Sequence, residues 1–179
     1  MGLRRLGRGA HELRQAPRRR VAGVAVVSIR LHNVGIVVED LTAVTEFFTH
    51  LGLELEGRAM TEGEWAGRVT GLGRQRVEVA MMRTPDGHGR LELSRFIEPE
   101  IVADNRRAPV NALGYLRVMF EVDDLDDVLE RATARGAELV SDGVVQFEHV
   151  YRLCYVRGPE GILIGLAQST REPASSSTE

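Results

Sequence analysis

The pattern of apolar and polar positions occurs twice along the chain. An apolar run over residues 34–38 ends in Glu39-Asp40-Leu41, and a second run over residues 118–122 ends in Asp123-Asp124-Leu125. Equivalent positions lie 84 residues apart, and the match keeps this register as far as Leu55 in the first copy. One register held across a strand, a helix and the following turn indicates an internal repeat.

Each copy predicts a strand and then a helix. The β-branched apolar run predicts a strand with at least one covered face. Asp40 and Asp124 suit the N-cap of a helix, because a carboxylate accepts the free amide hydrogens of the first turn. Apolar residues then recur on one helical face and a glycine follows, namely Leu41, Val44, Phe47, Phe48, Leu51 and Gly52, and in the second copy Leu125, Val128, Leu129, Ala132 and Gly136.

Further strand-like segments follow each helix. In the first copy they cover residues 76–83 and 90–96, and in the second copy 151–156 and 162–167. The turns between them contain the Gly, Pro and Asp residues that tight turns require. Each copy therefore predicts a strand, a helix and two or three more strands.

This repeated unit resembles the vicinal oxygen chelate superfamily, which includes glyoxalases, bleomycin resistance proteins and extradiol dioxygenases. The resemblance covers about residues 29–169 and rests on Val37-Val38-Glu39-Asp40-Leu41 and Glu121-Val122-Asp123-Asp124-Leu125. It implies an α+β fold of two βαβββ modules in tandem, whose strands form a cup-shaped half-barrel around one site. The implied domain spans residues 28–170, with module one at 29–98, a linker at 99–112 and module two at 113–169. Since this fold carries many activities, it does not fix the function.

The resemblance also implies where a catalytic metal would be bound. Metal enzymes of the family place a histidine seven residues before the capping aspartate of each module and an acidic ligand in each last strand. In this sequence these positions hold Asn33, Arg117, Glu92 and Gly165. Glu92 alone is a strong ligand, because an amide oxygen binds such metals weakly, a guanidinium repels cations and glycine has no side chain. A catalytic site needs three or four ligands, so we expect no metal cofactor.

A divalent metal (Zn, Ni, Fe or Mn) is the alternative cofactor, with Glu92 and His32 as its candidate ligands. Strand side chains alternate between faces, so His32 should point away from the cup if Asn33 points into it. Only a bulge would bring His32 back.

Several residues are candidate ligand contacts in the cup. Arg117 can pair with Glu92 or bind a carboxylate or phenolate, and an internal ion pair that only stabilises the cup is the alternative. Met119 and Glu121 share the face of Arg117 by alternation. Gly35 and Gly165 leave room for a bulky planar ligand, unless they reflect tight packing.

Two residues outside these strands are further candidates. Trp65 lies in the glycine-rich segment 61–73, which predicts a movable lid or stacking wall, or else a loop packed on the body. His149 is a candidate for lining the cup.

Two functions fit this site. The first is a protein that binds a small aromatic or carboxylate-bearing molecule without a metal, with Asn33, Glu92, Arg117 and Trp65 as contacts. The second is a lyase, isomerase or dioxygenase of the glyoxalase group. It would use a metal with His32, Asn33 or His149 recruited, or Glu92 as general base with Arg117 stabilising an enolate.

Composition narrows the remaining classes of function. All basic residues are arginines, which excludes Schiff-base and P-loop lysine chemistry, and the single cysteine, Cys154, allows no intrachain disulfide or cysteine metal cluster. No apolar run is long enough to span a membrane, and a cytoplasmic location is expected. A homodimer, which the family often forms, is an alternative to a monomer.

The two ends of the chain differ from its body. Residues 1–27 contain seven arginines and one glutamate, so they hold a net charge of +6 and leave about −9 for the rest, since the total is −3. This extension predicts a nucleic-acid or targeting arm, a disordered tail, or a start codon assigned too early. The acidic body argues against nucleic acid as a partner. The Ser-rich segment 171–179 is predicted to be a disordered tail.

Overall fold

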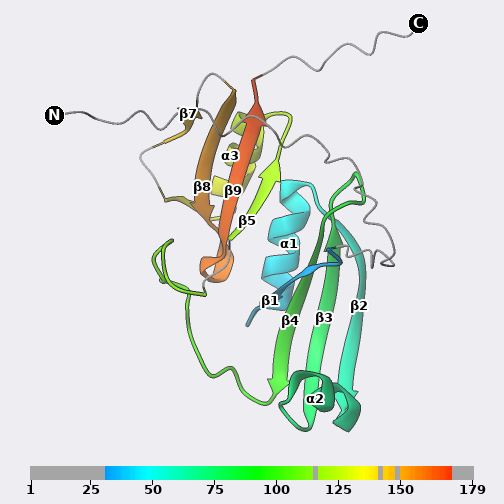
Figure 1. Cartoon of the computed structure of the whole chain (residues 1–179). Coiled ribbons are helices and arrows are strands. Elements are labelled where there is room, and N and C mark those ends of the chain that lie inside the picture. Colours follow the sequence, from blue (N-terminus) through cyan, green and yellow to red (C-terminus); the bar gives the residue numbers. More distant parts are fainter. Residues whose placement is uncertain (1–30, 115–116, 141–142, 148–149, 171–179) are drawn as a thin grey trace, which may run out of the picture. The chain divides into compact units, whose positions relative to one another are not determined.

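The computed structural model describes residues 31–114, 117–140, 143–147 and 150–170 (Figure 1). Module one contains β1 (Val34–Val37), α1 (Leu41–Leu51), β2 (Glu54–Gly63), α2 (Glu64–Thr70), β3 (Gln75–Arg83) and β4 (Arg90–Glu98). Module two contains β5 (Arg117–Glu121), α3 (Leu125–Thr133), β6 (Glu138–Leu139), β7 (Val145–Phe147), β8 (Tyr151–Arg157), the 3₁₀ turn η1 (Pro159–Gly161) and β9 (Leu163–Ser169). The predicted α+β fold of two βαβββ modules is confirmed. The predictions for residues 1–27 and 171–179 lie outside the described residues.

The two sheets have the same topology. Their strand orders are β1-β4-β3-β2 and β5-β9-β8-β6, with β7 also paired to β8. In each sheet the first strand of the module runs parallel to the last, and the other neighbours are antiparallel. Two parallel strands need a long crossover connection, and in each module this connection includes a helix. The helices α1 and α3 each cover one face of their own sheet (Figure 1).

The helices begin where the aspartates predict. Asp40 Oδ1 accepts a hydrogen bond from the Ala43 N–H at 2.9 Å, and Asp124 Oδ1 accepts one from the Asp127 N–H at 3.0 Å. Gly52 ends α1 with a left-handed φ of 113°. The predicted stop at Gly136 is too late, because α3 already ends at Thr133 and a turn carries the chain on to the glycine.

The modules share one hydrophobic core between their helix-covered faces. The Phe48 ring of α1 is fully buried and makes edge-to-face contacts with Phe47 at 5.6 Å and with Phe120 of β5 at 6.4 Å between ring centroids. Buried residues of module two, including Leu125, Val128, Val156, Ile164 and Leu166, belong to the same cluster. Burial of each large apolar side chain stabilises the fold by about 1.5–3 kcal/mol.

The glycine-rich segment 61–73 forms an ordered element. β2 continues to Gly63 and α2 follows directly. A Cβ atom placed on Gly67 would lie 0.9 Å from the Gly73 carbonyl oxygen, so Gly67 is needed for close packing of the backbone. The lid or stacking wall at Trp65 stays a prediction.

None of the helices in the described part of the chain is long and apolar enough to cross a membrane.

Candidate functional site

Asn33 and Glu92 meet on the outer face of the module one sheet, meaning the face turned away from the shared core. Val34 and Ile36 pack against the core, so the alternate residues of this segment project to the outer face. β1 and β4 are in register with Gly35 opposite Glu92. The Asn33 Nδ2 group donates a hydrogen bond to Glu92 Oε2 at 2.7 Å, and the other carboxylate oxygen accepts one from the Ser94 hydroxyl at 3.3 Å.

Arg117 occupies the equivalent outer face of module two. Val118 and Phe120 pack against the core, so Arg117, Met119 and Glu121 project to the opposite side, where all three are exposed. The Arg117 guanidinium carbon lies 5.6 Å from the centre of the Tyr155 ring, which is a cation–π contact. No hydrogen bond from its guanidinium is formed within the described part of the chain.

The two small residues of these faces differ in the space around them. A Cβ on Gly35 would meet nothing within 4 Å. A Cβ on Gly165 would lie 2.8 Å from Met119 Cε and 2.9 Å from a Tyr155 ring carbon. The surface is therefore open at Gly35, whereas the side chains of Met119 and Tyr155 fill the space at Gly165.

Glu92 and Arg117 do not pair in this chain. Across the described ranges no hydrogen bond or ion pair joins them, and each has its own partner within its module. The ion pair between Glu92 and Arg117, one of the two predicted roles of Arg117, is therefore not formed among the described residues. Pairing would require the outer faces of the two modules to be brought together.

The other sequence candidates lie apart from this pair. His32 is exposed, and His149 lies outside the described residues. Trp65 is 58% exposed on α2, the helix that packs against β2 and β3. Its indole lies beside the backbone of Gly63, since a Cβ there would be 3.6 Å from Trp65 Cδ1.

The residues at the implied metal position do not fit a metal ion. Asn33 donates its amide N–H to Glu92, Arg117 is a cation stacked on Tyr155, and Gly165 has no side chain. In the part of the chain that the structure describes, no group of three or more His, Cys, Asp or Glu side chains is arranged to hold a metal. We therefore assign no reaction step to a metal.

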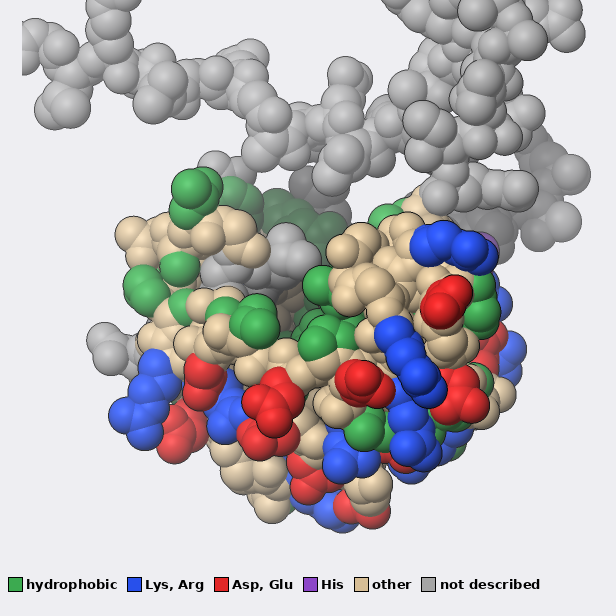
Figure 2. All heavy atoms as spheres, turned by 90° about the horizontal axis from the view of Figure 1, so that it is seen from below, with side chains coloured by type: hydrophobic (Ala, Val, Ile, Leu, Met, Phe, Trp, Pro, Cys, Tyr) green, Lys and Arg blue, Asp and Glu red, His purple; other side chains and the backbone are tan. Residues whose placement is uncertain are grey.

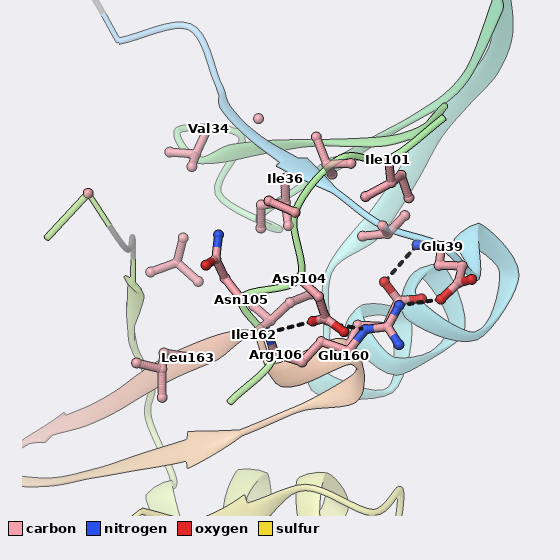
Figure 3. A pocket seen from close by; sticks show the side chains of 16 residues that line it. Val34, Ile36, Glu39, Ile101, Asp104, Asn105, Arg106, Glu160, Ile162 and Leu163 are labelled. Carbon is pink, nitrogen blue, oxygen red and sulfur yellow. Dashed lines mark hydrogen bonds and ion pairs between the residues drawn. The ribbon is translucent and has the colours of Figure 1, made fainter. Parts of the chain in front are cut away.

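A pocket of ≈ 310 Å³ lies between β1, the linker and the start of β9 (Figure 3). Its apolar wall contains Val34, Ile36, Ile101, Ile162 and Leu163, and its polar end contains Glu39, Asp104, Arg106 and Glu160. In a view from below, acidic and basic side chains lie side by side along the lower edge of the molecule (Figure 2). This pocket leaves no local pattern in the sequence, because its walls come from three segments that are distant along the chain.

Charged groups of module two and the linker hold the polar end together. Glu160, at a left-handed φ of 53°, accepts hydrogen bonds from the Asp40 N–H and, at 2.7 Å, from the Glu39 N–H. Arg106 forms an ion pair with the Glu39 carboxylate, and this contact raises the pKa of the guanidinium. Arg157 donates to the backbone carbonyls of Arg106 and Ala108 at 3.1 and 3.0 Å, which fixes the linker on module two.

Comparison with known proteins gives the family. The model of the glyoxalase/bleomycin resistance protein/dioxygenase superfamily matches residues 32–155. A glyoxalase family protein from Bacillus cereus is 62% identical in sequence, with a TM-score of 0.79 over 83% of this chain and 99% of that one. No curated protein matches the sequence significantly.

More distant structures share the fold alone. A glyoxalase/bleomycin resistance protein/dioxygenase domain from Frankia sp. EAN1pec is 14% identical, with a TM-score of 0.56 over 80% of this chain and 99% of that one. A variant of the fosfomycin resistance protein FosX from Listeria monocytogenes, solved with Mn(II) and a dihydroxypropylphosphonic acid, is 13% identical, with a TM-score of 0.52 over 82% of this chain and 93% of that one. Topology, repeat and similarity agree that the chain belongs to the glyoxalase/bleomycin resistance protein/dioxygenase superfamily.

Proposed function

We propose that this protein binds a small molecule bearing an anionic group, such as a carboxylate, phosphonate or phenolate, without a divalent metal. The observation that carries the proposal is the exposed Arg117, stacked on Tyr155 at a position where metal enzymes of the family hold a ligand. A guanidinium binds such oxyanions with two parallel hydrogen bonds. An aromatic ligand would also extend the stack that Tyr155 begins.

Glu92 and Asn33 supply the second half of the proposed site. The hydrogen bond at 2.7 Å holds the Glu92 carboxylate in place, with one oxygen also facing the Ser94 hydroxyl. A fixed carboxylate accepts hydrogen bonds from ligand hydroxyl or amide groups. Open space beside Gly35 gives a ligand access to it.

We propose that a homodimer completes the site. Both outer faces expose apolar residues, with Val37 55% and Met119 52% exposed, although the chain already buries the helix-covered faces in its core. A second copy that packs its module two face on the module one face of the first would bring an arginine toward Glu92. The opposite charges of these groups favour that pairing.

Ligand titration of matched variants tests the proposal. Isothermal titration calorimetry with benzoate, phenylphosphonate and 4-nitrophenolate should give saturable binding that Arg117→Gln weakens about tenfold or more, because the charge-assisted contact is lost. Arg74→Gln is the matched control, since Arg74 is exposed outside these two strands. Equal affinity in both variants would contradict the role of Arg117.

Metal content separates the proposal from the metal-dependent enzyme. Protein purified without chelator and then incubated with zinc, nickel, iron or manganese should hold far less than one equivalent, as should Glu92→Ala. A stoichiometric metal that Glu92→Ala loses would overturn the metal-free proposal and favour a lyase, isomerase or dioxygenase. Sedimentation velocity over a range of protein concentration tests the homodimer separately.

A further inference from the structure

The outer face of module two continues as an apolar surface beyond the pair formed by Arg117 and Tyr155. Val156 of β8 is fully buried in the shared core. Side chains of a strand alternate between its two faces, so Tyr155, Leu153 and Tyr151 of β8 point to the outer face. This row begins where the Arg117 guanidinium lies over the Tyr155 ring.

The short strand β7 widens this row at the edge of the sheet (Figure 1). Val145 of β7 lies opposite Leu153, and Phe147 lies opposite Tyr151. Residues that lie directly opposite each other in a sheet share a face, so Val145 and Phe147 also point outward. We name this set the apolar strip, and it consists of Val145, Phe147, Tyr151, Leu153 and Tyr155.

The apolar strip is open to solvent. Val145 is 55% exposed and Phe147 is 47% exposed, and the three residues of β8 are half-buried. The helix α3 lies on the opposite face of this sheet, where its buried residues belong to the shared core. Adjoining large apolar side chains that stay exposed are typical of a binding surface.

Positive charge lies at one end of the apolar strip. The Arg117 guanidinium lies over the Tyr155 ring and forms no ion pair within the described ranges. Arg157, two residues further along β8, adds a second positive charge at this end. Glu121 is on the same face, but it is four residues from Arg117 along β5, which is about 13 Å in a strand. The anionic group of a ligand is therefore favoured at the Tyr155 end of the strip.

The length of the strip indicates the size of the ligand body. A strand rises about 3.3 Å per residue, so the distance from Tyr155 to Tyr151 is about 13 Å. A single ring such as that of benzoate covers Tyr155 alone. An unbranched chain such as that of decanoate reaches Phe147 at the far end.

We propose that the apolar strip binds the body of an elongated apolar acid whose carboxylate is held by Arg117. This inference rests on the anion binding proposed above and specifies the class of ligand. The ligand is an amphiphilic carboxylate with a long aliphatic or aromatic body, and not a small hydrophilic anion. The strip lengthens the Arg117 site within one chain, toward β7.

Calorimetric titration with acetate, butyrate, octanoate and decanoate tests the proposal. We expect affinity to rise about twofold for each added methylene group, which corresponds to burial of about half of that group. Decyltrimethylammonium has a similar chain and the opposite charge. It should bind about tenfold more weakly than decanoate, because Arg117 repels it.

Variants of the edge strand test the contact from the protein side. Phe147→Ser should weaken decanoate binding about fivefold more than benzoate binding, since benzoate does not reach β7. Val145→Thr keeps the shape of the side chain and should weaken decanoate binding about twofold. Val69→Thr is the matched control, because Val69 is 79% exposed on α2 of module one. Thermal unfolding shows whether each variant is folded.

The outcomes separate this inference from the anion binding on which it rests. If Arg117→Gln weakens benzoate binding but chain length has no effect on affinity, anion binding stands and the strip proposal is wrong. Equal binding of decanoate and decyltrimethylammonium would also overturn it, and if no acid binds, both proposals are wrong. If sedimentation shows that Phe147→Ser turns a dimer into a monomer without changing decanoate affinity, the strip is an interface between copies and the proposal is wrong.

Discussion

The two modules share their framework and differ on their outer faces. Both place a parallel pair of strands beside a helix, and in both the residue before the helix-capping segment bonds to the last strand, Val38 to Ser94 and Val122 to Ala167. The outer faces diverge, with a hydrogen-bonded carboxylate in module one and an arginine stacked on tyrosine in module two. The repeat therefore conserves what the backbone needs and leaves the ligand-facing side chains free to vary.

The largest expected difference between the modules lies in the shared core. Phe48 of α1 and Ala132 of α3 occupy equivalent repeat positions and are both fully buried. Phe48→Ala should lower the free energy of unfolding by about 3–5 kcal/mol, because it removes a large ring and leaves a cavity. Ala132→Phe should cost about 1–3 kcal/mol through overpacking. Urea unfolding measures both, and a smaller loss for Phe48→Ala than for Ala132→Phe would contradict the observed division of the core.

The two N-cap aspartates, Asp40 and Asp124, should contribute about equally to the free energy of unfolding. Asp40→Ala and Asp124→Ala each remove one side-chain acceptor from the first turn of a helix, so each should cost about 1 kcal/mol. The matched controls are Asp40→Asn and Asp124→Asn, which keep an acceptor and should cost less. Thermal unfolding of the four variants checks this equivalence, and it fails if one cap costs several times more than the other.

The two glycines should respond differently to one added methyl group. Gly35→Ala places its Cβ in open space and should change stability by less than about 0.5 kcal/mol. Gly165→Ala forces Met119 and Tyr155 to move and should cost about 1 kcal/mol, since the end of Met119 is flexible. It should also disturb the stack under Arg117 and weaken anion binding. Calorimetry of ligand binding to both variants checks this, and equal effects would argue that the faces are alike.

The smallest expected effect is the pH dependence of stability that Cys154 causes, which has no counterpart in module one. Cys154 of β8 is the single cysteine and is buried, and burial raises the pKa of its thiol. The folded protein therefore keeps this proton to higher pH than the unfolded chain, so stability should fall as pH rises above about 8.5. Urea unfolding between pH 7 and 10 measures this slope against Cys154→Ala, which should show a shallower one.

Most of the fold could be predicted from local patterns in the sequence. Asp40 and Gly52 bound α1 where the sequence predicts, because capping depends on a few neighbouring residues. Strand alternation also placed Asn33 and Glu92 on one face, and their hydrogen bond confirms that geometry. The packing role of Gly67 was not predicted, because it depends on the approach of its backbone to Gly73.

The site was predicted only within each module. Alternation shows which face Glu92 and Arg117 occupy, but their separation depends on how α1 packs against α3, and no local pattern encodes that packing. The pocket along β1 was missed for the same reason. Its polar end exists because Arg157 holds the linker carbonyls, a contact between residues 49 and 51 positions apart.

The contact between Glu160 and the start of α1 has a consequence for synthesis on the ribosome. The Glu39 N–H and its acceptor are 121 positions apart in the chain. The amino-terminal half of the domain is therefore synthesised before Glu160. The carboxylate of Glu160 is the acceptor for the N–H groups just before α1. Because synthesis runs at about 5–20 residues per second, α1 is made about 6–24 s before the carboxylate of Glu160. Glu160 thus ties the start of α1 to a late part of the domain, which only β9 follows.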